Sequence, residues 1–183
     1  AISYHRIKGD TAEIFSKVRD HLLSGDLRSA VKTCEAFDHP VATTLKSGLL
    51  RFGKSNAKIE KVMESVALYE ISELERYLWI LATVANIAPL MGFLGTVSGM
   101  IASFEALAKV GLGNPQAVAG GIAEALITTA TGLIIAVPVQ TAYNYFNNKV
   151  SSFVLDMETS SSMLLETFSE IEEKESSPSS SST

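Results

Sequence analysis

The chain has 183 residues, of which 46% are hydrophobic and 19% are charged, and its formal net charge is −5. Its mean hydropathy of +0.22 is high for a soluble protein of this size and points to a membrane protein. The sequence carries no basic cluster interleaved with aromatic residues, which argues against a nucleic-acid partner.

Residues 1–76 are expected to form a cytoplasmic helical region. Asp10 starts a spacing typical of a capping box, and Gly25 is expected to close one helix. Asp26 can cap the next helix, and Pro40 suits the first turn of another. The chain begins with Ala1 rather than methionine and lacks the apolar stretch of a signal peptide, so we expect it to be a fragment or a processed product.

The cysteine and the histidines do not have the spacing of a disulfide, a metal site or a catalytic site. Cys34 is the only cysteine and cannot form an internal disulfide, while His5, His21 and His39 lack the spacing of metal ligands. No nucleophile and base stand at helical spacing near the apolar stretches. We therefore expect no metal, no cofactor and no enzymatic activity.

Two long apolar stretches predict membrane-spanning helices, at about residues 78–104 and 122–146, within a hairpin over 77–146. Each exceeds the roughly 20 residues that a helix needs to cross a bilayer. Turn residues between them predict a short external loop at 105–120. The fold class is therefore all-α, an integral membrane protein with long antiparallel helices in the lipid bilayer.

Helical periodicity continues on the cytoplasmic side of both spans. Because no glycine or proline occurs between Asn56 and Pro89, one helix is predicted to run unbroken from about Ala57 to Phe104. Residues 147–172 are predicted to extend the second span as a helix, and 173–183 to be a disordered tail. Lysine and arginine concentrate before the first span, so both ends are predicted to be cytoplasmic.

Each span has one face of small residues. On a helical wheel, small residues of the first span share a narrow arc: Ala85, Ala88, Gly92, Thr96, Gly99 and Ser103. A similar arc exists in the second span: Gly121, Ala125, Thr129, Gly132 and Ala136. Such faces let helix backbones approach closely in lipid, with large apolar residues on the opposite side.

Counting outward from the hairpin midpoint places two hydroxyl groups at one level. Thr96 and Thr129 are predicted to meet near the middle of the membrane, while Pro89 and Pro138 disturb the helices at a similar, more cytoplasmic depth. Two simpler interpretations remain open. The threonines could only bond the carbonyl one turn back, and the prolines could only kink the helices.

Glu124 is the one carboxylate inside either predicted span. An unpaired charge there is costly, so Glu124 should face protein or water rather than lipid. The residues alone leave three roles open, namely a helix-interface partner, a carboxylate at the outer rim and a proton-carrying group. Thr128 and Thr131 stand on adjoining wheel positions and are expected to pack.

Two stretches carry a resemblance to a known family: IAPLMGFLGTVSGMIASF at 87–104 and GGIAEALITTATGLIIAVPVQTAYNYF at 120–146. They resemble the ExbB/TolQ/MotA family of channel subunits of proton-driven motors, most closely its ExbB members. The resemblance implies three membrane helices, the first before residue 1. It also implies a pentamer in the bacterial inner membrane that surrounds an ExbD- or TolR-like single-span partner and does work on a TonB- or TolA-like protein.

The resemblance also implies roles for single residues. The pore threonines of the family correspond to Thr96 and Thr129, its carboxylate in the last span to Glu124, and its glycine-threonine-valine sequence to Gly95, Thr96 and Val97. The implied mechanism is that a membrane carboxylate of the partner becomes protonated and passes the ring of hydroxyls. Repeated neutralisation would then move the partner helix.

Other functions compete with an ExbB-like motor. A TolQ-like subunit would serve envelope maintenance instead, and a passive scaffold would use the small faces only for packing. A secondary transporter is disfavoured because no pair of broken helices is visible. Flagellar motor subunits usually have four spans and a larger cytoplasmic insertion, neither of which this sequence has.

Overall fold

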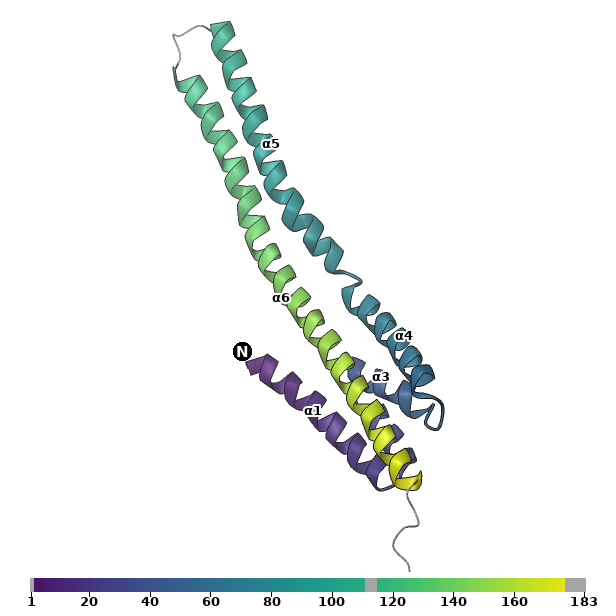
Figure 1. Cartoon of the computed structure of the whole chain (residues 1–183). Helices are drawn as coiled ribbons and strands as arrows, with labels where there is room; N and C mark the ends of the chain where they lie inside the picture. The colour runs from purple at the N-terminus through teal and green to yellow at the C-terminus, as the bar shows by residue number, and fades with distance from the viewer. Residues whose placement is uncertain (1, 111–114, 177–183) are drawn as a thin grey trace, which may run out of the picture. The chain divides into compact units, whose positions relative to one another are not determined.

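The computed structural model describes residues 2–110 and 115–176, and Figure 1 shows that its regular structure is helical throughout. The helices are α1 (Ile2–Leu23), α2 (Leu27–Glu35), α3 (Pro40–Leu49), α4 (Asn56–Glu75), α5 (Leu78–Val110) and α6 (Pro115–Ser176). The all-α class is therefore confirmed. The chain divides into a helical unit, made of 1–74 and 149–183, and a hairpin unit, made of 75–148.

Local sequence signals explain several helix ends of the helical unit. Gly25 has a φ of 77°, in the left-handed region that glycine enters readily, and it ends α1. Asp26 caps α2 by accepting the Ser29 amide at 3.0 Å, and hydrogen bonds from Ser29 lower the pKa of this carboxyl. Asp10, however, starts no helix. It lies inside α1, which already begins at Ile2.

His39 and Pro40 together start α3. The His39 imidazole Nδ1 accepts the Val41 amide at 3.3 Å, and Pro40 occupies the first turn, where no amide donor is needed. The His39 ring also packs edge to face on Phe153, with centroids 5.3 Å apart. These contacts give His39 a structural role.

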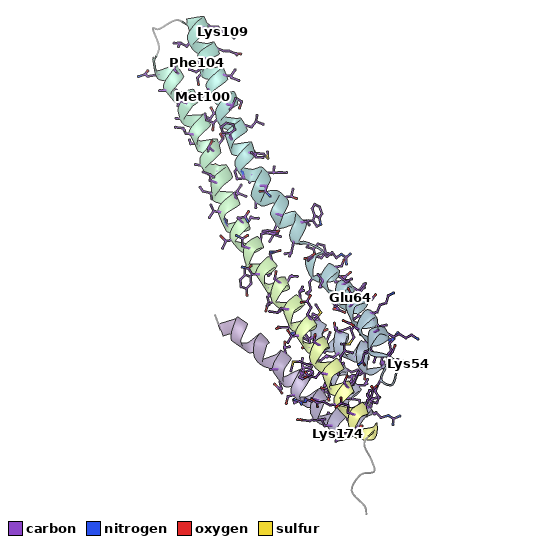
Figure 2. All side chains as sticks on the ribbon, in the orientation of Figure 1. Lys54, Glu64, Met100, Phe104, Lys109 and Lys174 are labelled. Carbon is purple, nitrogen blue, oxygen red and sulfur yellow. The ribbon has the colours of Figure 1, made fainter. Side chains whose placement is uncertain are left out.

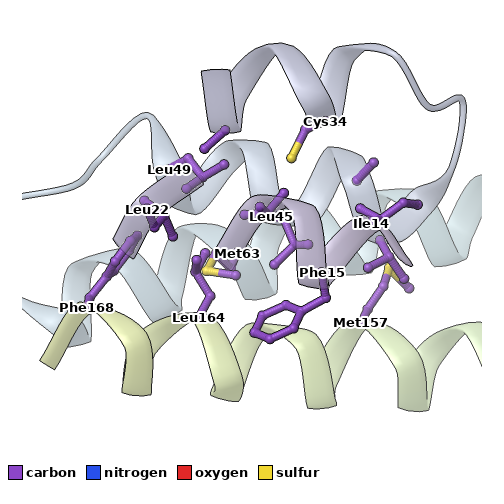
Figure 3. Close-up of a cluster of buried hydrophobic side chains, with 14 of the residues drawn as sticks. Ile14, Phe15, Leu22, Cys34, Leu45, Leu49, Met63, Met157, Leu164 and Phe168 are labelled. Carbon is purple, nitrogen blue, oxygen red and sulfur yellow. The ribbon is translucent and has the colours of Figure 1, made fainter. Parts of the chain in front are cut away.

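The helical unit has its own apolar core, shown in Figure 3. Buried side chains from five helices meet there, among them Ile14 of α1, Leu45 of α3, Met63 of α4 and Leu164 of α6. Cys34 belongs to this core, and burial raises the pKa of its thiol to about 11, so the thiol is neutral and inert.

Gly48 lets three helices of this core come close. A Cβ at Gly48 in α3 would lie 2.5 Å from the Met63 sulfur and 3.0 Å from a Leu164 methyl group. A larger residue would therefore require the Met63 and Leu164 side chains to shift or α3 to move away from them.

The hairpin unit is made of α5 and the first part of α6. Both helices are long and apolar enough to cross a membrane, over Leu78–Lys109 and Val118–Lys174. Only 11% and 17% of their most apolar windows are buried, so these helices are not the core of a soluble fold. Figure 2 shows exposed side chains such as Met100 and Phe104 along α5.

Several helix bounds differ from the sequence prediction. The helix predicted from Ala57 to Phe104 is wrong as a single element, since a turn at Arg76 and Tyr77 separates α4 from α5. Glycine and proline are absent from this turn, so no local breaker marked it. The helices also enter the range predicted as loop, 105–120: α5 continues to Val110 on strong helix formers, and α6 begins at Pro115.

The C-terminal end of α6 enters the predicted tail. The helix ends at Ser176, inside the range 173–183 that sequence composition had marked as a tail. Glutamates and a lysine in this last turn favour helix, whereas the serine-rich sequence after it does not. Residues 177–183 lie outside the described part of the chain.

Candidate functional site

The small faces of α5 and α6 form the seam between the two helices. On α5 every small-face residue is buried or half-buried: Ala85, Ala88, Gly92, Thr96, Gly99 and Ser103. The same holds on α6 for Gly121, Ala125, Thr129, Gly132 and Ala136. Large apolar residues point away, with Leu94 66% exposed and Ile134 73% exposed. The helical wheel thus predicted correctly which side of each helix packs.

Glycines, which have no side chain, let the two backbones approach each other along the seam. A Cβ at Gly99 would lie 2.7 Å from the Ala125 Cβ, and one at Gly132 would lie 2.6 Å from the Ala88 carbonyl oxygen. Towards the loop, a Cβ at Gly121 would collide with the Ser103 hydroxyl. The atoms that Gly99 and Gly132 face cannot rotate away as the Ser103 hydroxyl can, so these two glycines fix the register of the hairpin.

Thr96 and Thr129 meet at the centre of the seam. Their hydroxyl oxygens are in direct hydrogen-bonding contact, and both side chains are half-buried. The Thr129 hydroxyl also reaches the Gly92 carbonyl at 3.0 Å, and the Thr96 hydroxyl reaches the Ala125 carbonyl at 3.4 Å. Each threonine therefore has a backbone acceptor on the opposite helix.

The hydrogen-bond donors and acceptors of this threonine pair limit its possible role in proton transfer. Each hydroxyl supplies one proton, and the acceptors are the other hydroxyl, the Ala125 carbonyl and the Gly92 carbonyl, which Thr96 also reaches at 3.2 Å. Several donor arrangements satisfy the pair, so its hydrogen bonds can reorient. Threonine does not ionise near neutral pH, so the pair can pass or orient a proton but cannot hold one.

Neighbouring hydroxyls are bonded within their own helices. Thr128 donates to the Ala125 carbonyl at 2.7 Å, and Thr131 donates to the Ile127 carbonyl at 2.9 Å. A Cβ at Gly95 would collide with the Thr128 side chain, so Thr128 packs over the glycine of α5. Both threonine side chains are exposed, so only the contact of Thr128 with Gly95 agrees with the packing expected of these two residues.

Glu124 lies away from the seam. Its side chain is exposed on α6, one residue before the buried Ala125, and no described hydrogen bond or ion pair involves it. Within a single chain, the hairpin therefore does not bring Glu124 to Thr96 or Thr129. Its role remains a proposal.

Both prolines lie inside continuous helices. Pro89 is within α5 and Pro138 within α6. Neither can donate the amide hydrogen bond of a helix interior, which leaves the carbonyls of Ala85 and Ile134 without that donor. A weak layer in the helices at this depth stays a prediction.

Sequence reasoning missed the backbone acceptors of the site. The carbonyls of Gly92 and Ala125 hold the hydroxyl pair, yet a carbonyl has no residue-type signature. The spacing of four residues between Gly92 and Thr96 predicts the bond within α5, but nothing in the sequence signals the two bonds across the hairpin.

The chain is similar to known proteins over the region that contains the seam. Residues 35–159 match the sequence profile of the MotA/TolQ/ExbB proton channel family, a range that includes the whole seam. The chain is 31% identical over 140 residues to a biopolymer transport protein ExbB homolog of Methanothermobacter thermautotrophicus, which covers 76% of this chain and 50% of that one.

Two further relatives carry two of the three names in the family's description. Biopolymer transport protein ExbB of Aquifex aeolicus is 40% identical over 105 residues, 57% of this chain and 64% of that one. Tol-Pal system protein TolQ of Haemophilus influenzae is 45% identical over 87 residues, 48% and 38% of the two chains. The chain thus covers from about a third to under two thirds of these relatives. It belongs to the MotA/TolQ/ExbB proton channel family.

Proposed function

We propose that this chain is the ExbB-like channel subunit of a proton-driven motor in the bacterial inner membrane. With an ExbD-like single-span partner, it would use the proton motive force to energise TonB-dependent transport across the outer membrane. The observation that carries the proposal is the Thr96–Thr129 hydroxyl contact inside an otherwise apolar seam. Relatives named ExbB support this choice within the family.

In the proposed assembly, copies of the hairpin form a ring, a homo-oligomer and by family resemblance a pentamer, around the partner helix. The half-buried hydroxyls of Thr96 and Thr129 would accept and donate hydrogen bonds along a narrow lumen. Because this pair cannot hold a proton, a titrating carboxylate must be supplied elsewhere, by the partner or by Glu124. Both chain ends would be cytoplasmic.

Replacing both threonines by alanine tests this function. Alanine is preferable to valine, because the two hydroxyl oxygens are closer than two methyl groups can approach. The Thr96→Ala/Thr129→Ala chain, reconstituted with its partner, should assemble normally and lose most proton flux. Thr96→Ser/Thr129→Ser keeps both hydroxyls and should retain the flux.

A passive scaffold is the second candidate, and one observation favours it. Every hydroxyl proton of the pair can be satisfied by protein acceptors, so the pair also works as simple helix packing. Undiminished proton flux in the double alanine chain would support the scaffold and refute the channel.

A TolQ-like subunit is the remaining alternative within the family, favoured by the match to TolQ. Complementation distinguishes it from ExbB. A TonB-energising subunit should restore TonB-dependent uptake to cells that lack their own ExbB, whereas a Tol-type subunit should restore outer-membrane integrity to cells that lack TolQ.

A further inference from the structure

The helical unit has an open groove between α4 and α6. Its volume is about 500 Å³, and its floor is made of apolar side chains that include Met63 and Met157, each 1% exposed. Leu68 lies on its edge and is 61% exposed, although it is a large apolar residue. An apolar groove with an exposed leucine at its edge suits an incoming apolar side chain.

The charges around this groove have one sign. Glu60 and Glu64 of α4 and Glu158 of α6 line it, and neither lysine nor arginine is among its described lining residues. All three carboxylates are exposed, and none belongs to an ion pair in the described part of the chain. The groove therefore combines an apolar floor with an acidic rim.

The second groove of the same unit gives a direct contrast. It lies between α1 and α6, measures about 480 Å³, and is lined by Arg19 as well as Asp20 and Asp156. Its charges are of mixed sign, so it lacks the one-sided potential of the first groove. Two grooves of nearly equal size on the same helix thus differ in charge.

We propose that the α4/α6 groove binds a short basic segment of a different protein, one that carries leucine-like residues on one face and lysine or arginine at its edges. Charge complementarity with the acidic rim identifies this occupant. From Glu60 to Ile71 the groove is about 17 Å long, which fits roughly three turns of a helix.

The occupant can be named by class if the proposed function holds. A single-span membrane protein carries its lysine and arginine on the cytoplasmic flank of its span. Such a flank has the chemistry that the groove selects. The α4/α6 groove is then the site where the single-span partner of the proposed motor is held outside the membrane.

Site-specific cross-linking tests the groove on the full chain in detergent. A photoreactive benzoylphenylalanine replaces Ser161, which lines the α4/α6 groove, or Thr159, which lines the α1/α6 groove. The probe is a biotinylated 12-residue peptide with leucine and lysine at helical spacing, and its counterpart carries glutamate in place of lysine. Detergent binding of the peptide affects both positions equally and cancels in the comparison.

The lysine peptide should cross-link at position 161 about tenfold more than at position 159, and the glutamate peptide at neither. Combining Glu60→Gln, Glu64→Gln and Glu158→Gln should remove this difference, while Glu166→Gln and Glu172→Gln, outside the groove, should not. Equal labelling at both positions, or labelling that survives the triple change, would overturn the proposal. So would cross-linking of two copies of this chain through position 161 without peptide.

Proton flux is measured separately on the same preparations. Loss of peptide cross-linking specificity with normal flux would refute only the groove. Normal flux in the Thr96→Ala/Thr129→Ala chain would refute the proposed channel and leave the groove assignment standing.

Discussion

The Thr129 hydroxyl of α6 donates a hydrogen bond across the hairpin to the Gly92 carbonyl of α5, over 3.0 Å. This bond exists because Gly92 has no side chain. A Cβ there would lie 3.0 Å from the Thr129 Cα and 3.1 Å from the Thr128 carbonyl oxygen, both of them backbone atoms. Close packing and hydrogen bonding in the seam therefore depend on the same residue.

Gly92→Ala should destabilise the hairpin. The added methyl group forces α5 and α6 apart and stretches the Thr129 bond, with an expected cost of roughly 1–3 kcal/mol, typical of overpacking. Thermal unfolding of the chain in detergent measures the effect as a lowered Tm. The matched control is Gly120→Ala, because a Cβ at Gly120 meets nothing within 4 Å. That change should be neutral or stabilising by up to about 1 kcal/mol. An equal fall of the Tm in both variants would contradict the close packing of Gly92 against α6.

The two threonines should be energetically coupled. Thr96→Ala and Thr129→Ala each remove one partner of the same contact, so the double variant should cost less than the sum of the single ones. Interhelical hydrogen bonds in membranes average about 0.6 kcal/mol and reach about 1.7 kcal/mol. A double-mutant cycle on unfolding in detergent measures the coupling. Strict additivity would show that the hydroxyls do not interact in the folded chain.

Much of the seam followed from the sequence because residue size sets it. Gly92, Gly99 and Gly132 recur at helical spacing, and only their side of each helix lets the backbones approach. Counting from the loop also paired Thr96 with Thr129, since an antiparallel hairpin of straight helices has one register. Residue size and spacing can be read from the sequence, and two apolar stretches joined by turn residues indicate a hairpin.

Three features had no such signal. The turn at Arg76 and Tyr77 contains neither glycine nor proline, so local preference favoured an unbroken helix. The acceptors at Gly92 and Ala125 are backbone carbonyls, which every residue possesses. The groove that Glu64 borders also depends on how α4 and α6 pack, because its residues are far apart in the sequence.

Glu124→Gln should separate the roles that remain open for this carboxylate. Its side chain is exposed in the single chain, so the Tm of the isolated chain should change little. A proton-carrying group would lose proton flux at least tenfold in the reconstituted complex, whereas an interface partner would lose assembly instead. Glu105→Gln, at an exposed position on α5, is the control. Unchanged flux and assembly would leave Glu124 as a rim carboxylate.

Glu70 should make the helical unit less stable as pH rises. Burial, together with the nearby charges of Asp38 and Glu73, raises the pKa of this carboxyl above its ordinary value of 4.5. Its contribution to stability is therefore full below that ordinary value and is lost as pH rises through the raised pKa of the folded state. Glu70→Gln should raise stability at pH 7 by a few tenths of a kcal/mol and change little at pH 4.

Thermal unfolding at both pH values measures the Glu70 effect as a difference in Tm. Glu172→Gln, at an exposed position on α6, corrects for the general loss of one negative charge. If the Tm of the Glu70 variant rises no more at pH 7 than at pH 4, burial and these neighbouring charges do not destabilise the ionised carboxylate.

Trp79 should report where the membrane begins. It is the only tryptophan of the chain, it is 65% exposed, and it stands in the first turn of the apolar helix α5 beside the exposed Tyr77. Amphipathic rings at such an end prefer the head-group level of a bilayer. In lipid vesicles, quenchers attached near the head groups should therefore reduce its fluorescence more than quenchers near the bilayer centre. Trp79→Phe provides the blank, and strong quenching by aqueous iodide without lipid quenching would place this end of α5 in water.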